Sequence, residues 1–394
     1  MAGITGLGTT YGLPNFTGPL FQLTPSDTPL LSAIGGLTGG RQSSATRFEW
    51  QTFDLRTAAQ NVALEGAAAP TAQERVRASA NNVVEIHQDS VDVSYTSLAT
   101  PGQLSGLAVA GSENPVQNEL QWQLTQKIKE IARDVNFSFV NGTYQLPSDN
   151  STARKTRGLN AAISTNAVSK GTSIGTGLTL TGSTDKVTAT SHGMSNGDRV
   201  KVTNLVTTTG ISEGGCYFVV SSATNDFKLS LTAGGSAIDL VGDGTADITK
   251  LAALTEATLL DGLQSAYDNG GLSEGETRVL LVNSRQRRAV TAVFADAYGK
   301  ADPVTGNVAG VSVQEIQTDF GKLKVMMDRA VYQDTALILS LEQLSPVFLE
   351  VPGKGHFFAE PLAKTGASDK VQLYGEVGLA YGNERAHAKI TGLF

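Results

Sequence analysis

Apolar side chains recur at helical spacing between residues 114 and 142, and they predict the longest helix of the chain. Successive positions lie three or four residues apart, which gathers them on one helix face; they are Leu120, Leu124, Ile128, Ile131, Val135 and Phe139. Asn114 is expected to cap the helix, Pro115 suits its first turn, and Gly142 supplies a left-handed stop. At about 1.5 Å per residue the helix is roughly 39 Å long. This length suits the spine of an extended molecule, with an ordinary long core helix as the alternative.

Two segments before this helix alternate between apolar and polar residues, as β-strands do. The first spans residues 45–56 and includes Trp50, and the second spans residues 82–96. A phase slip near Gln88 and Asp89 predicts a β-bulge in the second segment. About 25 residues separate the strands, so we expect a projecting hairpin with a long polar tip. An isolated hairpin is marginally stable in water, which suggests that this one rests on a neighbouring molecule.

The N-terminal region has an unusual composition. Residues 1–40 hold nine glycines, four prolines and a single charged side chain, Asp27. The segment has little reason to form a domain, but its apolar residues require a surface; they include Leu13, Phe16, Leu20, Phe21, Leu23, Leu30, Leu31 and Ile34. We expect an extended arm that lies on another surface, with disorder as the alternative.

Residues 173–250 are rich in glycine, serine and threonine, and turn signals separate short strand-like runs. The predicted strands are 178–181, 186–190, 199–203, 216–221, 227–231 and 237–240. Strands at this spacing are typical of a small β-barrel or sandwich. Helical patterns resume at Leu254, so we interpret this region as an inserted domain.

The segment from residue 254 to 350 alternates between helical and strand-like patterns, which predicts an α/β layer with a mixed sheet. Thr255 is expected to cap a helix that stops at Gly270, and Ser284 a second helix that runs to Tyr298. The predicted strands are 278–283, 311–318, 322–328 and 337–341, with Asp319-Phe320-Gly321 as a hairpin turn. Residues 371–381 alternate cleanly, as a strand with one face on a core that could pack beside the spine helix.

Composition adds several limits. The 394 residues suffice for two or three domains, and 17% charged residues with 43 glycines favour a β-rich, loop-rich structure. A net charge of −7 argues against nucleic-acid binding driven by overall charge. The single cysteine, Cys216, excludes an intrachain disulfide framework. No apolar run approaches 18 residues, and no secretory signal opens the chain. We therefore expect no membrane partner, and we expect synthesis in a cytosol.

Catalytic and metal-binding patterns do not emerge. None of His87, His192, His356 and His387 pairs with another at metal-ligand spacing. His87 and Asp89 are interpreted as a surface pair, and Cys216 as a buried strand residue. The sequence contains neither a Gly-x-Ser-x-Gly elbow nor a phosphate-binding loop. We therefore expect no enzyme activity, no catalytic residues, no cofactor and no metal.

Three arginines stand in the first turn of the second predicted helix. Arg285, Arg287 and Arg288 oppose the helix dipole there, at a cost of about 0.3–1 kcal/mol each when exposed. They are expected to form salt bridges within the chain or between subunits, with a polyanion as the alternative partner.

The order of these parts resembles the Hong Kong 97-type major capsid proteins of tailed bacteriophages. Asp27-Thr28-Pro29-Leu30-Leu31 and the closing segment from Asn383 to Gly392, NERAHAKITG, look like the subgroup similar to the phage SU-ten major head protein. The resemblance implies an α+β capsid fold with an all-β insertion. Its parts would be an N-terminal arm (1–44), an extended loop (45–96), a peripheral domain with the spine helix (97–153), an axial domain (154–172 and 251–350), the inserted barrel (173–250) and a C-terminal return to the peripheral domain (351–394).

This resemblance implies a subunit that assembles as hexamers and pentamers into an icosahedral shell around phage double-stranded DNA. Its expected partners are further copies of itself, separate scaffolding, portal and decoration proteins, and packaged DNA held non-specifically on the inner face. Assembly in the host cytoplasm and residence in the virion capsid follow. The alternative is a phage tail or baseplate adhesion protein whose β-rich insert binds a receptor.

The inserted segment resembles a small β-barrel module of phage structural proteins, similar to the first catalytic cysteine half-domain of ubiquitin-activating enzymes. The resemblance rests on the run from His192 to Val200, HGMSNGDRV, followed by CYFVV and FKLSL. It gives Cys216 no catalytic role, and it implies a domain on the outer face of the shell.

Contacts between subunits are expected mainly from the hairpin. The candidate residues are Trp50, Glu65, Glu74, Arg75 and Arg77, together with Arg285, Arg287 and Arg288. Some shells of this fold lock their extended loops covalently through lysine, but the first lysine of this chain is Lys127. Locking at this loop is therefore predicted to be non-covalent.

Overall fold

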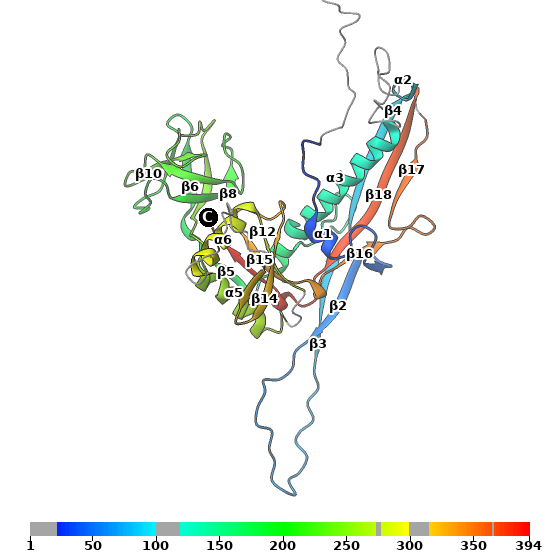
Figure 1. The fold of residues 1–394 in the computed structure, drawn as a ribbon, viewed down its shortest axis with the longest axis vertical. Helices are drawn as coiled ribbons and strands as arrows, with labels where there is room; N and C mark the ends of the chain where they lie inside the picture. Colours follow the sequence, from blue (N-terminus) through cyan, green and yellow to red (C-terminus); the bar gives the residue numbers. More distant parts are fainter. Residues whose placement is uncertain (1–21, 100–118, 273–276, 299–314, 365) are drawn as a thin grey trace, which may run out of the picture.

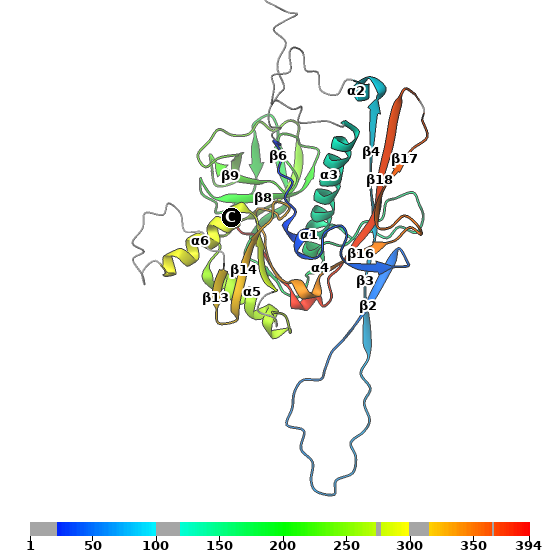
Figure 2. The same ribbon diagram turned by 45° about the vertical axis from the view of Figure 1, so that its right-hand side comes forward.

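The computed structural model describes residues 22–99, 119–272, 277–298, 315–364 and 366–394. A long sheet carrying the spine helix forms one side of the molecule, and a mixed sheet with a closed barrel forms the other (Figure 1). A hairpin ending in a long loop projects from the base of the long sheet in both views (Figure 2).

Strand β18 (Ser368–Ala380) is the centre of the long, five-stranded sheet. It pairs antiparallel with β4 along one edge and with β17 and β16 along the other, and β1 joins β16 in parallel. The bounds of these strands are Arg41–Ser43 for β1, Glu85–Ser94 for β4, Ser345–Leu349 for β16 and Phe357–Pro361 for β17.

Helix α3 (Glu119–Asn141) lies along this sheet. Its residues Ile131, Val135 and Phe139 are buried in one cluster with Leu373 and Val377 of β18, which confirms that the late strand packs beside the spine. Ile128, predicted on the same face, is 47% exposed. The predicted cap at Asn114 and Pro115 lies outside the described residues.

Gly142 ends α3 for a reason other than the predicted left-handed stop. Its φ is outside the left-handed region, and a Cβ there would lie 2.6 Å from the carbonyl oxygen of Thr156. The Gly158 N–H donates to the Gly142 carbonyl at 2.9 Å. Glycine is required because two backbone segments approach each other closely.

The six-stranded sheet has the order β13-β14-β12-β15-β19-β5 and is mixed, as predicted, because β12 runs parallel to β14 and antiparallel to β15. Helices α5 (Glu256–Asp268) and α6 (Ser284–Tyr298) accompany it. Its strands are Ala167–Ser169 (β5), Arg278–Val282 (β12), Glu315–Thr318 (β13), Gly321–Met327 (β14), Ala336–Ser340 (β15) and Ala388–Thr391 (β19). Residues 311–314 of the predicted hairpin lie outside the described residues.

Of the two predicted helix caps, the one on α5 is confirmed and the one on α6 is wrong. Thr255 caps α5 by accepting a hydrogen bond from Thr258 N–H, and Gly270 ends it with φ of 83°. Asn283, and not Ser284, caps α6, because Asn283 Oδ1 accepts from the Arg285 N–H at 2.8 Å. The buried strand β12 thus runs directly into its cap.

The inserted region forms a closed barrel with the order β10-β7-β6-β11-β8-β9. Its strands are Thr172–Thr181 (β6), Lys186–Thr188 (β7), Arg199–Val206 (β8), Cys216–Val220 (β9), Asp226–Ser230 (β10) and Gly244–Lys250 (β11). The strand predicted at 237–240 is wrong, and β11 takes its place between β6 and β8. Lys201 Nζ lies 2.7 Å from Asp334 Oδ2 and joins the barrel to the loop between β14 and β15.

The hairpin pairs β2 (Arg47–Phe53) with β3 (Arg77–Val83). The predicted pairing of 45–56 with 82–96 is therefore wrong, because β4 joins the five-stranded sheet instead. The bulge near Gln88 is also wrong, since the register of β4 with β18 is continuous and the phase changes earlier, at Val84.

Two other assignments differ from the predicted division of the chain. Strand β16 belongs to the five-stranded sheet although it precedes the predicted return at residue 351, and β19 lies in the six-stranded sheet although it follows that point. The predicted arm also folds partly on its own chain: α1 (Pro29–Ala33) buries Leu30 and Leu31, and the Leu31 N–H donates to Asn136 Oδ1 at 3.0 Å.

The remaining short elements complete the chain. They are α2 (Tyr95–Ala99), α4 (Leu159–Ala162) and the 3-10 turns η1 (Leu341–Gln343) and η2 (Glu384–Ala386).

Candidate self-assembly surfaces

The loop that links β2 to β3 is exposed along its whole length, residues 54–76. It extends away from the rest of the molecule in both views (Figures 1 and 2). Four of its large apolar side chains face water: Leu55 is 73% exposed, Val62 76%, Leu64 85% and Val76 87%. Four exposed apolar side chains on one projecting segment make this loop the candidate contact surface. Sequence reasoning treated this tip as polar and missed these residues.

Trp50 fixes the root of this hairpin to its own chain. The indole N–H donates to the Gly382 carbonyl at 2.7 Å, and the ring meets Tyr381 edge-on at 4.9 Å between centroids. Within the chain Trp50 is thus an anchor, and its predicted contact with another subunit stays a prediction.

Of the charged candidate residues on the hairpin, one contacts its own chain and three do not form an ion pair among the described residues. Arg77 Nη1 donates to Gln51 Oε1 across the two strands at 3.0 Å. Glu65, Glu74 and Arg75 are exposed, and in the part of the chain that the structure describes none of them is in an ion pair. These three side chains remain available for a partner.

The arginines of α6 lie in different surroundings. Arg287 Nη1 donates to the Val325 carbonyl at 2.9 Å, and burial lowers the pKa of its guanidinium. Arg285 Nε is buried without a hydrogen-bond acceptor among the described residues, whereas Arg288 is exposed. Neither Arg285 nor Arg288 forms a salt bridge within the described ranges, so a contact with another molecule stays a prediction for both.

His87 contacts a residue that the sequence did not indicate. Its Nε2 lies 2.8 Å from Glu85 Oε1, and both side chains are 11% exposed. Burial acts to raise the pKa of Glu85, but hydrogen bonds from His87, Ser138 and the Thr156 N–H outweigh it, so the pKa is lowered. The predicted surface pair of His87 with Asp89 is wrong, because Asp89 pairs with Lys127 of α3 at 3.0 Å. These contacts fasten β4 to α3.

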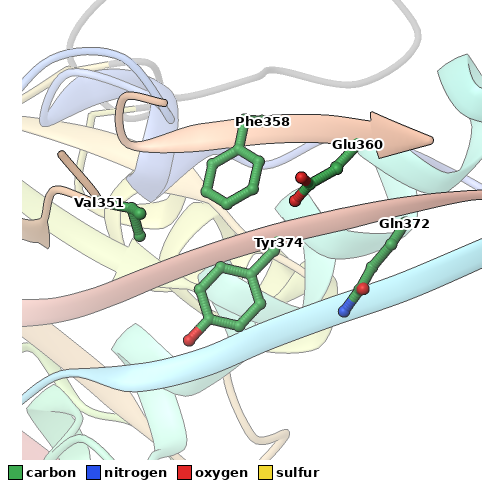
Figure 3. A pocket seen from close by; sticks show the side chains of 5 residues that line it. All are labelled: Val351, Phe358, Glu360, Gln372 and Tyr374. Carbon is green, nitrogen blue, oxygen red and sulfur yellow. The ribbon is translucent and has the colours of Figure 1, made fainter. Parts of the chain in front are cut away.

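A hollow of about 350 Å³ opens on the side of the five-stranded sheet away from α3. Figure 3 shows the Phe358 and Tyr374 rings side by side on neighbouring strands, with Glu360 and Gln372 next to them and Val351 at one end. The ring centroids are 5.7 Å apart, and Lys354 Nζ lies 5.2 Å from the centre of the Phe358 ring. The hollow offers aromatic surface with a carboxylate at its rim, which suits contact more than chemistry.

Groups that could hold a metal are not found among the described residues. Cys216 is half-buried, and burial, followed by the charge of Asp334, raises the pKa of its thiol, which disfavours the nucleophilic thiolate. Among the described helices none is long and apolar enough to cross a membrane.

Comparison with known proteins decides the family. The model of the SU10 major capsid protein family matches residues 3–394. The chain belongs to this family.

One solved structure supports the fold, and two others are similar to the chain. The cyanophage A-1(L) capsid asymmetric unit aligns over 95% of this chain and 95% of its own, with a TM-score of 0.54 and 12% identity. The capsid of cyanophage P-SCSP1u aligns over 99% and 96%, with a TM-score of 0.49 and 11% identity. The capsid of a native GTA particle aligns over 98% and 96%, with a TM-score of 0.49 and 11% identity. No curated protein sequence matches the chain significantly.

This chain is therefore a major capsid protein with the Hong Kong 97-type fold, and a structural component of the virion capsid. The predicted family, fold class and function are confirmed. The alternative of a tail or baseplate adhesion protein gains no support.

Proposed function

We propose that this major capsid protein builds its shell without catalysis, by laying the loop of residues 54–76 across a neighbouring copy. The observation that carries the proposal is the complete exposure of that loop together with its four apolar side chains. Burying large apolar side chains contributes roughly 1.5–3 kcal/mol each before the costs of association. Many such contacts per shell sum to a stable particle.

The same proposal covers the finer organisation of the particle. Copies associate as hexamers and pentamers in the host cytoplasm, with separate scaffolding, portal and decoration proteins, and the shell holds DNA non-specifically on its inner face. The chain divides into the arm, loop, peripheral, axial and inserted parts given above. The exceptions are β4 and β16, which belong to the five-stranded sheet, and β19, which belongs to the six-stranded sheet. The barrel then stands on the outer face.

The loop can be tested without disturbing the folded body. The double variant Val62→Asp and Leu64→Asp places two charges on side chains that have no place in the described cores. We expect an unchanged unfolding temperature but no closed shells when the protein is expressed with its head proteins and viewed by negative-stain microscopy. The matched control is Gln60→Asp with Thr71→Asp, which charges the same loop at polar positions. Normal shells from the apolar-to-Asp variant would contradict the proposal.

A further inference from the structure

A groove of about 460 Å³ lies where the barrel meets α3 and the loop between β14 and β15. Three of its apolar lining residues are exposed: Phe137 of α3 by 50%, Leu231 of the barrel by 72% and Tyr332 of the loop by 42%. Its volume falls within the roughly 300–1,000 Å³ of cavities that hold ligands. The groove is therefore large enough for several side chains, and no described segment fills it.

The described part of the chain begins beside this groove. Arg329 lines the groove, and its Nε lies 3.0 Å from Asp27 Oδ1. In both views the first described residues run between the barrel and α3 (Figures 1 and 2). Leu23 in this stretch is 96% exposed, whereas Leu30 and Leu31 of α1 are buried, so the chain is anchored by α1 and the exposed ion pair sets where the segment before it begins.

The charges of the two partners match. Asp27 carries the first charged side chain of the sequence, and Arg329 carries the one permanent charge among the residues that line the groove. The rest of the lining is apolar or neutral, and the segment before Asp27 is likewise uncharged and contains apolar residues. Asn283 and Gln333 supply polar atoms for the backbone of a bound peptide.

We propose that residues 1–21 of the same chain dock in this groove, where Leu20 and Phe21 cover its apolar side chains. Six residues span at most roughly 20 Å, so Phe21 reaches the groove from the Asp27–Arg329 pair without leaving its own subunit. The proposal goes beyond shell formation because it gives the inserted barrel an internal role. The docked segment contacts barrel and body together, and thereby holds the barrel in one orientation.

Cys216 makes a direct test possible, because it lines the groove and is the one cysteine of the chain. Leu20→Cys and Phe21→Cys are introduced singly into the full-length protein, which is then oxidised with diamide. Diamide accepts two electrons and two protons as the two thiols join. We expect an intrachain disulfide with Cys216 in at least one variant, identified by peptide mass spectrometry. The control is Leu64→Cys on the projecting loop, which should give no such bridge.

Two outcomes of the oxidation overturn the proposal. A bridge to Cys216 that forms only between chains means that a neighbouring copy supplies the segment. A complete absence of bridges, with both thiols still free, means that the groove holds something else. Either outcome leaves shell formation untouched, so it is distinguishable from failure of the proposed function.

Alkylation of Cys216 by N-ethylmaleimide gives a second measurement that needs no new cysteine. If the segment occupies the groove nine-tenths of the time, removal of residues 2–21 raises the alkylation rate roughly tenfold. Arg329→Gln, which removes the ion pair at an exposed position, should raise the rate less. Equal rates in the full-length and shortened proteins would refute the docking.

Discussion

At the scale of single residues, buried and half-buried side chains join segments that are far apart in sequence through hydrogen bonds. Trp50 ties the hairpin to Gly382. The buried His387 links the end of β15 in the six-stranded sheet to the residue that follows β18 in the five-stranded sheet. His387 Nδ1 accepts from the Ser340 N–H at 3.2 Å, and Nε2 lies 3.1 Å from the Tyr381 carbonyl, to which it donates in the neutral tautomer. Both side chains hold distant parts of the backbone in place.

Replacing Trp50 by phenylalanine should loosen the hairpin without unfolding the body. The change removes the hydrogen bond to the Gly382 carbonyl, a loss of about 1 kcal/mol. Amide hydrogen exchange in β2 and β3 should then be roughly fivefold faster, as that free energy implies. The matched control is Phe53→Leu, because Phe53 lies on the same hairpin and is 68% exposed. Equal exchange in the two variants would remove the anchoring role from Trp50.

His387 should make the fold sensitive to mild acid. Burial lowers its pKa below the ordinary 6.5, against the opposing effect of the Tyr381 carbonyl. Below pH 6.5 the unfolded chain binds a proton that the folded chain does not, so stability falls with falling pH until the folded-state pKa is reached. The slope is up to about 1.4 kcal/mol per pH unit.

Chemical unfolding of the wild type and of His387→Asn between pH 5 and pH 7.5 measures this contribution. Asparagine keeps one acceptor and one donor but does not titrate. The difference in unfolding free energy between the two proteins should shrink as the pH falls. A difference that stays constant over this range would show that His387 titrates alike in both states.

At the scale of elements, α6 can be tested at its first turn. Asn283→Ala removes the cap that accepts from the Arg285 N–H and should destabilise the protein by about 1 kcal/mol. Ser284→Ala, one residue later, should cost much less, because Ser284 is exposed and already helical. Urea midpoints of the two variants compare the costs directly. The reverse order would restore Ser284 as the cap.

Elements with a strong apolar period were predictable from the sequence, and those that depend on paired charges were not. The apolar stripe of α3 predicted a long helix, and three of its members, Ile131, Val135 and Phe139, lie in the buried cluster. In β4 the inward positions include Glu85 and His87, whose burial is possible because the two polar side chains contact each other at 2.8 Å. A hydrophobic pattern cannot reveal that pairing. The phase change was therefore predicted near Gln88, whereas the structure has it at Val84.

At the scale of the whole molecule, the order of parts carried more information than any motif. That order indicated the capsid fold, whereas β19, a strand of four residues that lies between β15 and β5 in the six-stranded sheet, was too short to predict. The contact surfaces were only partly predictable. The charged residues of the loop could be named, but the exposure of Leu64 and its apolar neighbours required the folded structure.

The whole shell should dissociate completely in denaturant. The hairpin and its loop contain no lysine, since Lys127 is the first of the chain. Assembled particles boiled in dodecyl sulfate should therefore run as a single band at the 41.1 kDa of the chain. Ladders whose cross-linked peptides map to residues 45–96 would contradict a non-covalent loop.

The chain enters and leaves the barrel at neighbouring positions, because Thr172 at the start of β6 pairs with Lys250 at the end of β11. Any folded module whose two ends lie one strand spacing apart, about 4.8 Å, can stand in the same place without stretching the sheet beneath it. With the barrel on the outer face, as proposed above, this geometry makes residues 172 and 250 a natural grafting site for displaying foreign domains on the particle. Such a chimaera would keep its loop and spine, but it would lose half of the groove beside Arg329.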